Sequence, residues 1–235
     1  VNHGDEWGGV PDPVAYTRFL RETAVRLKAQ DPQAFILNAP LDLFSPNTRG
    51  EPFVNEMVYW DADSFLDAMW QADPDIFALL DGWASHPYPV GPFKAPPEKS
   101  DQAFRYSDGR LVEKAYSQPS QLHYHGIQGY EWELWKLNSL GVPSLPVFIT
   151  ETGWRHGEGW VEMETAVSYL TAARDVWLAD DRVYAITPFA LNGHPSEWTH
   201  TSWLGLDETG QIVDVYPLAG AWACQPGSLA VETNE

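Results

Sequence analysis

The chain has 235 residues, of which 44% are hydrophobic and 14% aromatic, enough for one domain with a sizeable buried core. It carries 14 Lys and Arg against 33 Asp and Glu, and the formal charge of −19 would repel phosphate backbones and anionic membranes, which argues against a nucleic-acid partner. The single cysteine, Cys224, excludes an internal disulfide framework, and no apolar run reaches membrane-spanning length.

The first predicted elements are a helix and a strand. Asp12 and Pro13 form a typical helix start, because a capping side chain precedes a proline at the first helical position. The helix should end near Asp31, and its apolar positions recur at helical spacing: Tyr16, Phe19, Leu20, Ala24 and Leu27. Residues 34–40, AFILNAP, form a short continuous apolar run, which is typical of a strand buried on both faces.

The middle of the chain continues this alternation. Helical patterns at residues 62–72 and 74–80 precede the apolar-to-polar segment GWASHPYP, residues 82–89. Residues 90–117 are rich in Pro, Lys, Asp and Ser without periodicity, which indicates a long excursion. A helical pattern returns at about residues 119–139.

The last third predicts strand, helix and strand. PVFITE, residues 146–151, reads as a strand, and a helix follows at about residues 160–179. RVYAITPFAL, residues 182–191, should be another buried strand. Alternation of this kind implies right-handed crossovers and a parallel sheet with helices outside. One face of the predicted helix carries Met163, Val167, Leu170, Ala173 and Trp177.

Polar side chains gather where these strands end. Chemistry in parallel α/β folds collects at the carboxyl ends of the strands, and Glu151 lies at such an end. His86 and Tyr88 are two residues apart, so they share one face of an extended segment. Two further loops would complete a common mouth: Asn2, His3, Asp5, Glu6 and Trp7 before the first helix, and Asn192, His194, Glu197, Trp198, His200 and Trp203 after the last strand.

These motifs resemble a known family of enzymes. ITETGW is similar to the seventh-strand motif of the retaining glycoside hydrolases of clan A, and GWASHPYP to their sixth strand. VNHGDEWGG resembles the segment directly after the Asn-Glu pair of their fourth strand. The resemblance extends from Val1 to about Pro217 and is nearest to families 5 and 39. It implies an α/β fold, with residues 1–235 as a single partial domain: the C-terminal part, about strands five to eight, of a TIM (β/α)8 barrel.

The resemblance also implies roles for the strand-end residues. Glu151 would be the nucleophile that forms a covalent glycosyl-enzyme, which requires a second carboxyl roughly 5 to 5.5 Å away. Tyr88 would hydrogen-bond the nucleophile, and His86 would contact the network around the acid/base. The substrate would be a carbohydrate, and neither cofactor nor metal is expected. Expected substrate-binding residues are Trp7, Trp154, Trp198 and Trp203, which would stack on sugar faces, with Asn2, Asn192 and His194.

The second carboxyl is where the sequence departs from the family pattern. If Val1 and Asn2 align with the residues after Asn-Glu, the acid/base would immediately precede Val1. We therefore expect a fragment that is inactive alone, with the upstream half of the same barrel as its partner. Glu6 is disfavoured as a substitute acid, because a retaining site tolerates little change in carboxylate separation. A solvated loop charge is the simpler interpretation of Glu6.

Structural interpretations stand beside these roles. Glu151 could cap the following segment or pair with Arg155, and His86 and Tyr88 could satisfy buried polar groups. Most of the 12 tryptophans must belong to the core. His123 and His125 form an H-x-H pair, but alternate residues diverge on a helix, so we interpret them as surface residues.

A second function remains open at the level of sequence. The chain could be a noncatalytic, carbohydrate-binding or interaction half-barrel that keeps the aromatic mouth without the chemistry. Sugar binding unchanged by Glu151→Gln would favour that function. Only analogy with exported polysaccharide-degrading enzymes suggests a place outside the cell or at its surface, and the sugar and linkage are not encoded in any motif.

Overall fold

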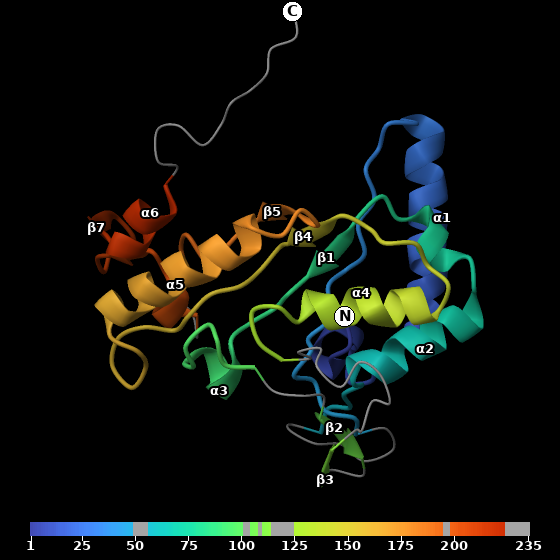
Figure 1. Ribbon diagram of the computed structural model, residues 1–235, viewed down its shortest axis with the longest axis horizontal. Helices are drawn as coiled ribbons and strands as arrows, with labels where there is room; N and C mark the ends of the chain where they lie inside the picture. Colours follow the sequence, from blue (N-terminus) through green and yellow to red (C-terminus); the bar gives the residue numbers. More distant parts are fainter. Residues whose placement is uncertain (49–55, 101–103, 108–109, 114–124, 195–197, 224–235) are drawn as a thin grey trace, which may run out of the picture.

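A three-stranded parallel sheet lies at the centre of the computed structural model (Figure 1). Its strands are β1 (Trp83–Ser85), β4 (Val147–Ile149) and β5 (Val183–Ile186), in the order β1-β4-β5. The predicted parallel sheet is confirmed. Helices α1 and α2 lie on one side of the strands in Figure 1, and α5 on the other. The structure describes residues 1–48, 56–100, 104–107, 110–113, 125–194 and 198–223.

The first two helices begin at capped positions. Helix α1 (Pro13–Gln30) starts as predicted, with the Asp12 carboxylate accepting a hydrogen bond from the Ala15 amide at 2.9 Å. Helix α2 (Ala62–Ala72) is capped in the same way by Asp61, and the predicted range 62–72 is confirmed. The pattern at residues 74–80 forms only a short 3-10 helix, η2 (Ile76–Leu79).

Residues 34–40 differ from the predicted strand. Their one ladder contact is a parallel bridge between Leu37 and Gly82, next to β1. The Asn38 amide takes the place of further backbone pairing, because its oxygen accepts from Ala84 N at 2.7 Å and its nitrogen donates to Ala84 O at 3.0 Å. Burial on both faces is also wrong for this segment, since Phe35 is 57% exposed.

Two apolar clusters hold the helices against the sheet. The first joins α1, α2 and η2 around Trp83 of β1. The second places Val147 and Ile149 of β4 against Leu170 and Trp177 of α5 (Met163–Leu178), whose predicted range of 160–179 is close to the observed one. Since Val147 and Ile149 pack toward the helices, the alternate residue of the strand faces the opposite side of the sheet.

That opposite side is only partly covered. Phe148 of β4 contacts the rings of Phe35 and Tyr184, with centroids 5.3 and 6.2 Å apart. Tyr184 itself is 70% exposed, so the predicted burial of residues 182–191 is wrong for β5. β5 is exposed because it lies at the edge of the three-stranded sheet and has β4 as its only neighbour among the described strands.

The helix predicted at residues 119–139 begins later in the structure. Helix α4 (Tyr130–Ser139) follows a turn in which Gly126 has φ of 118°, and residues 119–124 lie outside the described chain. His125 therefore precedes the helix and is buried, with its Nε2 2.8 Å from Leu43 O and its ring stacked on Phe44. Its prediction as a surface residue is wrong; His123 lies outside the described residues.

Several short elements have no counterpart in the sequence prediction. The excursion at residues 90–117 contains a short helix and an antiparallel hairpin, and a second hairpin packs near α6. None of the described helices is long and apolar enough to cross a membrane. The short elements that the sequence did not predict are η1 (Gly4–Trp7), α3 (Val90–Phe93), β2 (Phe104–Ser107), β3 (Arg110–Glu113), η3 (Thr199–Thr201), β6 (Leu204–Leu206), β7 (Ile212–Val215) and α6 (Pro217–Trp222).

Candidate active site

A cavity of about 1090 Å³ lies at the carboxyl ends of β1 and β4. Its size suits a ligand of several rings, since ligand pockets commonly occupy roughly 300 to 1,000 Å³. The parallel register pairs Ser85 with Ile149, so the residues that follow both strands emerge at one edge of the sheet. His86, Tyr88 and Glu151 consequently lie together in the cavity wall.

Glu151 is held from two sides by the segment after β1. The Tyr88 hydroxyl donates a hydrogen bond to its Oε2 at 3.0 Å. Nδ1 of His86 lies 3.4 Å from the same oxygen, while Nε2 of His86 is 3.1 Å from the Thr150 hydroxyl. Both neighbours contact the same carboxylate oxygen, Oε2, and no hydrogen bond from the segment after β1 reaches Oε1.

Burial sets the protonation of these three groups. It lowers the pKa of His86 to about 4, so the imidazole is neutral at pH 7. Burial also raises the pKa of the Tyr88 phenol, which stays protonated and able to donate. The pKa of Glu151 lies above its usual value because of burial, and the hydrogen bond from Tyr88 opposes that rise. A hydrogen bond from the neutral Tyr88 and a contact with the neutral His86 ring, rather than a salt bridge, therefore hold the carboxylate.

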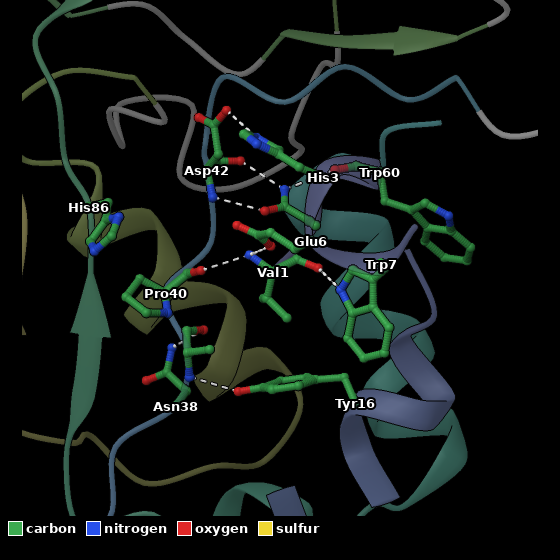
Figure 2. Close-up of polar contacts among 12 residues, drawn as sticks. Val1, His3, Glu6, Trp7, Tyr16, Asn38, Pro40, Asp42, Trp60 and His86 are labelled. Carbon is green, nitrogen blue, oxygen red and sulfur yellow. Dashed lines mark hydrogen bonds and ion pairs between the residues drawn. The ribbon is translucent and has the colours of Figure 1, made fainter. Parts of the chain in front are cut away.

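The opposite wall of the cavity comes from the start of the chain and the segment after Asn38 (Figure 2). His3 Nε2 contacts Asp42 Oδ2 at 2.6 Å, and the Phe44 amide donates to the other Asp42 oxygen at 2.7 Å. Burial works against both charges in this pair, but the contact prevails: the pKa of His3 is raised and that of Asp42 lowered.

Asn2 supports this wall from behind and does not face a ligand. Its side chain is fully buried and donates to the carbonyls of Asp42 and Trp60, each at 2.9 Å. Its amide oxygen accepts from Asp42 N at 2.9 Å. The substrate-binding role predicted for Asn2 is corrected, because all these polar groups are occupied within the protein.

The first residues also contribute to the cavity wall. The Val1 nitrogen lies 2.5 Å from a Glu6 carboxylate oxygen and 3.4 Å from Pro40 O, and Trp7 Nε1 donates to Val1 O at 2.8 Å (Figure 2). Glu6 is half-exposed, and its charge contributes to the raised pKa of Glu151.

The predicted tryptophans divide into two pairs. Trp7 and Trp198 line the cavity, and Trp198 forms a T-shaped contact with Phe189 with ring centroids 5.5 Å apart. Trp154 is 3% exposed and donates to Ala95 O at 2.8 Å, and Trp203 is 9% exposed within the second apolar cluster. Trp154 and Trp203 are thus core residues, and their predicted stacking on sugars is corrected.

Asn192 and His194 lie outside the cavity lining. The Asn192 side chain accepts a hydrogen bond from His194 N at 2.9 Å, which stabilises the local turn. Sequence reasoning missed Asp42, Phe93 and Phe189, which do line the cavity. Asp42 and Phe189 follow apolar runs and could have been found as strand-end residues, whereas Phe93 lies in the aperiodic stretch and carries no such signal.

Known proteins resemble this one in structure and not in sequence. No family model and no curated sequence matches the chain. An endo-β-1,3-glucanase of glycoside hydrolase family 128 from Pseudomonas viridiflava matches with a TM-score of 0.50 and 15% identity, over 89% of this chain and 61% of its own. The corresponding enzyme from Sorangium cellulosum matches with a TM-score of 0.47 and 13% identity, over 84% and 57%.

A family 39 enzyme from Xanthomonas axonopodis pv. citri also matches, with a TM-score of 0.36 and 15% identity, over 91% of this chain and 45% of that one. The chain therefore spans less than two thirds of each of these enzymes. The Pseudomonas match shows a glycosidase-like fold. At such low identity it shows the fold alone, and neither family 5 nor family 39 is shown as the family of this chain.

Proposed function

We propose that the protein hydrolyses O-glycosidic bonds in a β-linked oligosaccharide or polysaccharide by a retaining double displacement, with Glu151 as the nucleophile. The observation that carries this proposal is the 3.0 Å hydrogen bond from Tyr88 to Glu151 at the end of a parallel strand, inside an aromatic cavity. The glycosidase-like fold supports the same reaction class.

In the proposed first step, Glu151 Oε1 attacks the anomeric carbon and the bond to the leaving oxygen breaks. A carboxylic acid gives that oxygen its proton, and in the second step the same group removes a proton from the water that cleaves the glycosyl ester. Tyr88 and the neutral His86 contact Oε2, and none of the described residues hydrogen-bonds Oε1, so Oε1 is the oxygen that would attack. Trp7 and Trp198 offer flat apolar surfaces to the sugar rings.

We place the acid/base on the residue that immediately precedes Val1, within an upstream half of the same barrel. The Val1 nitrogen lies in the cavity wall, so a residue attached to it would start within that wall, across from Glu151. Reading the coding DNA upstream of the Val1 codon tests this placement. An in-frame Asn-Glu pair supports it, and a stop codon followed by a start codon at Val1 overturns it.

An activated substrate tests Glu151 separately from the acid/base. A 2-deoxy-2-fluoro β-glycoside with a dinitrophenolate leaving group needs no proton donor for its departure, and the fluorine slows hydrolysis of the glycosyl-enzyme. We expect intact-protein mass spectrometry to show one added glycosyl group, and peptide mapping to place it on Glu151. Glu151→Gln should give no adduct, whereas the exposed Glu162→Gln should be labelled as wild type is.

Three results would contradict the proposal: an adduct elsewhere, an inverted product from the chain restored with its upstream half, or full activity of Glu151→Ala in that protein. Sugar binding without an adduct, unchanged by Glu151→Gln, would instead support the noncatalytic carbohydrate-binding function.

A further inference from the structure

An aromatic cage surrounds the side chain of Arg155, next to the cavity. Its guanidinium carbon lies 4.9 Å from the ring centroid of Phe93, 4.7 Å from that of Trp160 and 4.8 Å from that of Trp198. Phe93 and Trp198 are also cavity-lining residues, so the cage and the cavity share a wall. Lys94 adds a second cation, with Nζ 4.6 Å from the Trp160 centroid.

Three separate segments build the cage. Phe93 and Lys94 come from the end of α3, Arg155 and Trp160 from the loop after β4, and Trp198 directly precedes η3. Backbone hydrogen bonds fix this loop: Arg155 N donates to Phe93 O at 3.2 Å, and Val161 N donates to Arg155 O at 3.3 Å. Phe93 adopts φ of 62°, a left-handed conformation that is costly for a bulky residue and is a feature of functional sites.

The two cations of the cage have no acidic partner within the part of the chain that the structure describes. No ion pair joins Arg155 or Lys94 to a carboxylate there, although Lys94 donates to Gly159 O at 2.6 Å. Arg155 Nε is buried without a hydrogen-bond partner among these residues. Acidic residues outnumber basic ones by 33 to 14 in this protein, so a pair of cations kept apart from carboxylates is a distinctive arrangement.

We propose that this cage, formed by Phe93, Lys94, Arg155, Trp160 and Trp198, binds an acidic sugar unit whose carboxylate is recognised by Arg155. The inference rests on the proposed glycosidase function and adds the chemical class of its substrate. A guanidinium presents its N–H donors in a fork that matches both oxygens of a carboxylate. The flanking rings supply the apolar surface on which a sugar ring stacks.

The position of the cage fixes where the acidic unit would bind. Phe93 packs against Tyr88 with tilted rings whose centroids are 4.5 Å apart, and Tyr88 donates a hydrogen bond to Glu151. The acidic unit would therefore occupy a subsite next to the unit that Glu151 attacks, not the reacting unit itself. Arg155 acts as a specificity residue, and the pairing of its charge with a carboxylate would weaken as salt is added.

Calorimetric titration of the intact chain tests this subsite without requiring turnover. The probes are a β-linked glucose oligosaccharide and the same oligosaccharide with one C6 hydroxymethyl group oxidised to a carboxylate. We expect the oxidised probe to bind on the order of tenfold more tightly, with that preference lost in Arg155→Gln and reduced by added NaCl. Arg26→Gln, at an exposed site on α1, is the matched control and should keep the preference.

Equal affinity for both probes, or binding of neither, would overturn the subsite. Loss of binding to both probes in a folded Arg155→Gln protein would also overturn it, because Arg155 would then hold the site together without selecting between the probes. Arg155→Lys keeps the charge without the fork and should retain part of the preference. The two proposals fail separately: selective binding without a glycosyl adduct would refute the nucleophile alone, and an adduct without selectivity would refute the acidic subsite alone.

Discussion

The polar side chains on the two walls of the cavity differ in how they are hydrogen-bonded. On the wall from the start of the chain, Asn2, His3 and Asp42 pair with one another and with the backbone. On the wall at the ends of β1 and β4, Tyr88 and His86 converge on one oxygen of Glu151. Polar groups that pair with one another hold the shape of a wall, whereas a carboxylate oxygen that no described residue hydrogen-bonds remains open to a ligand.

The largest expected difference between the walls is in activity. Glu151→Gln should lower kcat by roughly a thousandfold or more in the protein that contains its acid/base, because the nucleophile is lost while the fold is kept. Steady-state hydrolysis of a β-linked oligosaccharide measures this, with unfolding followed by circular dichroism. A mutant that unfolds at a much lower temperature would show that Glu151 belongs to the supporting structure instead.

The support behind the wall at the ends of β1 and β4 should depend on pH. Glu133 of α4 is fully buried and accepts a hydrogen bond from the Ser85 hydroxyl of β1, and burial raises its pKa to about 8 from an ordinary 4.5. The folded state therefore holds a proton that the unfolded chain releases. This contribution is complete below pH 4.5 and declines by at most about 1.4 kcal/mol per pH unit as the pH rises toward 8.

Glu133→Gln should remove this decline, since the neutral amide can still accept from Ser85. Urea unfolding at several pH values between 5 and 9 would show the mutant gaining on wild type as the pH rises. The exposed Glu162→Gln should follow wild type throughout. Parallel curves for wild type and Glu133→Gln would mean that Glu133 is ionised in the folded protein.

On the wall from the start of the chain, mutation should lower the stability of the fold without a separate effect on activity. Asn2→Ala removes the three hydrogen bonds of a fully buried side chain, and we expect a loss of roughly 2 to 3 kcal/mol in the free energy of unfolding. Asn138→Ala, at an exposed position of α4, should change it by less than about 0.5 kcal/mol. A fall in activity without a fall in stability would make Asn2 a ligand contact after all.

The smallest effect should come from Tyr88→Phe. Loss of one hydrogen bond to the carboxylate should lower kcat/KM roughly tenfold and raise the pKa of Glu151 further, because the bond favours the ionised form. The acidic limb of the pH profile should therefore move to higher pH. Tyr184→Phe, with an exposed ring on β5, is the control. An unshifted limb would separate Tyr88 from the ionisation of Glu151.

Local signals in the sequence were enough to predict much of the fold. Asp12 followed by Pro13 marked the start of α1, and the apolar runs around Trp83 and Val147 located two parallel strands. The short strand expected at residues 34–40 failed because the Asn38 side chain, and not the backbone, pairs with Ala84. The pattern of apolar residues predicts where backbones pair, and it carries no information about a side chain, such as that of Asn38, that pairs in place of the backbone.

The site was less predictable than the fold, because the type of a residue does not determine how exposed its side chain is. Glu151, His86 and Tyr88 lie together because strand ends meet at one edge of a parallel sheet. Trp154 and Trp198 look equivalent in sequence, yet the first is 3% exposed and the second lines the cavity. Long-range packing separates them, and no local pattern reports it.

The edge position of β5 has a consequence for the behaviour of the protein in concentrated solution. Among the described strands β5 has a neighbour on one side only, so the chain by itself offers unpaired backbone groups and a 70% exposed tyrosine to any other copy that approaches, whereas the proposed upstream half of the barrel would cover this edge. The net charge of −19 opposes that approach at neutral pH, whereas near the isoelectric point of about 4.5 the repulsion disappears. Repulsion between like charges thus keeps copies apart, and acidification or concentrated salt should favour self-association of the chain by itself through this edge.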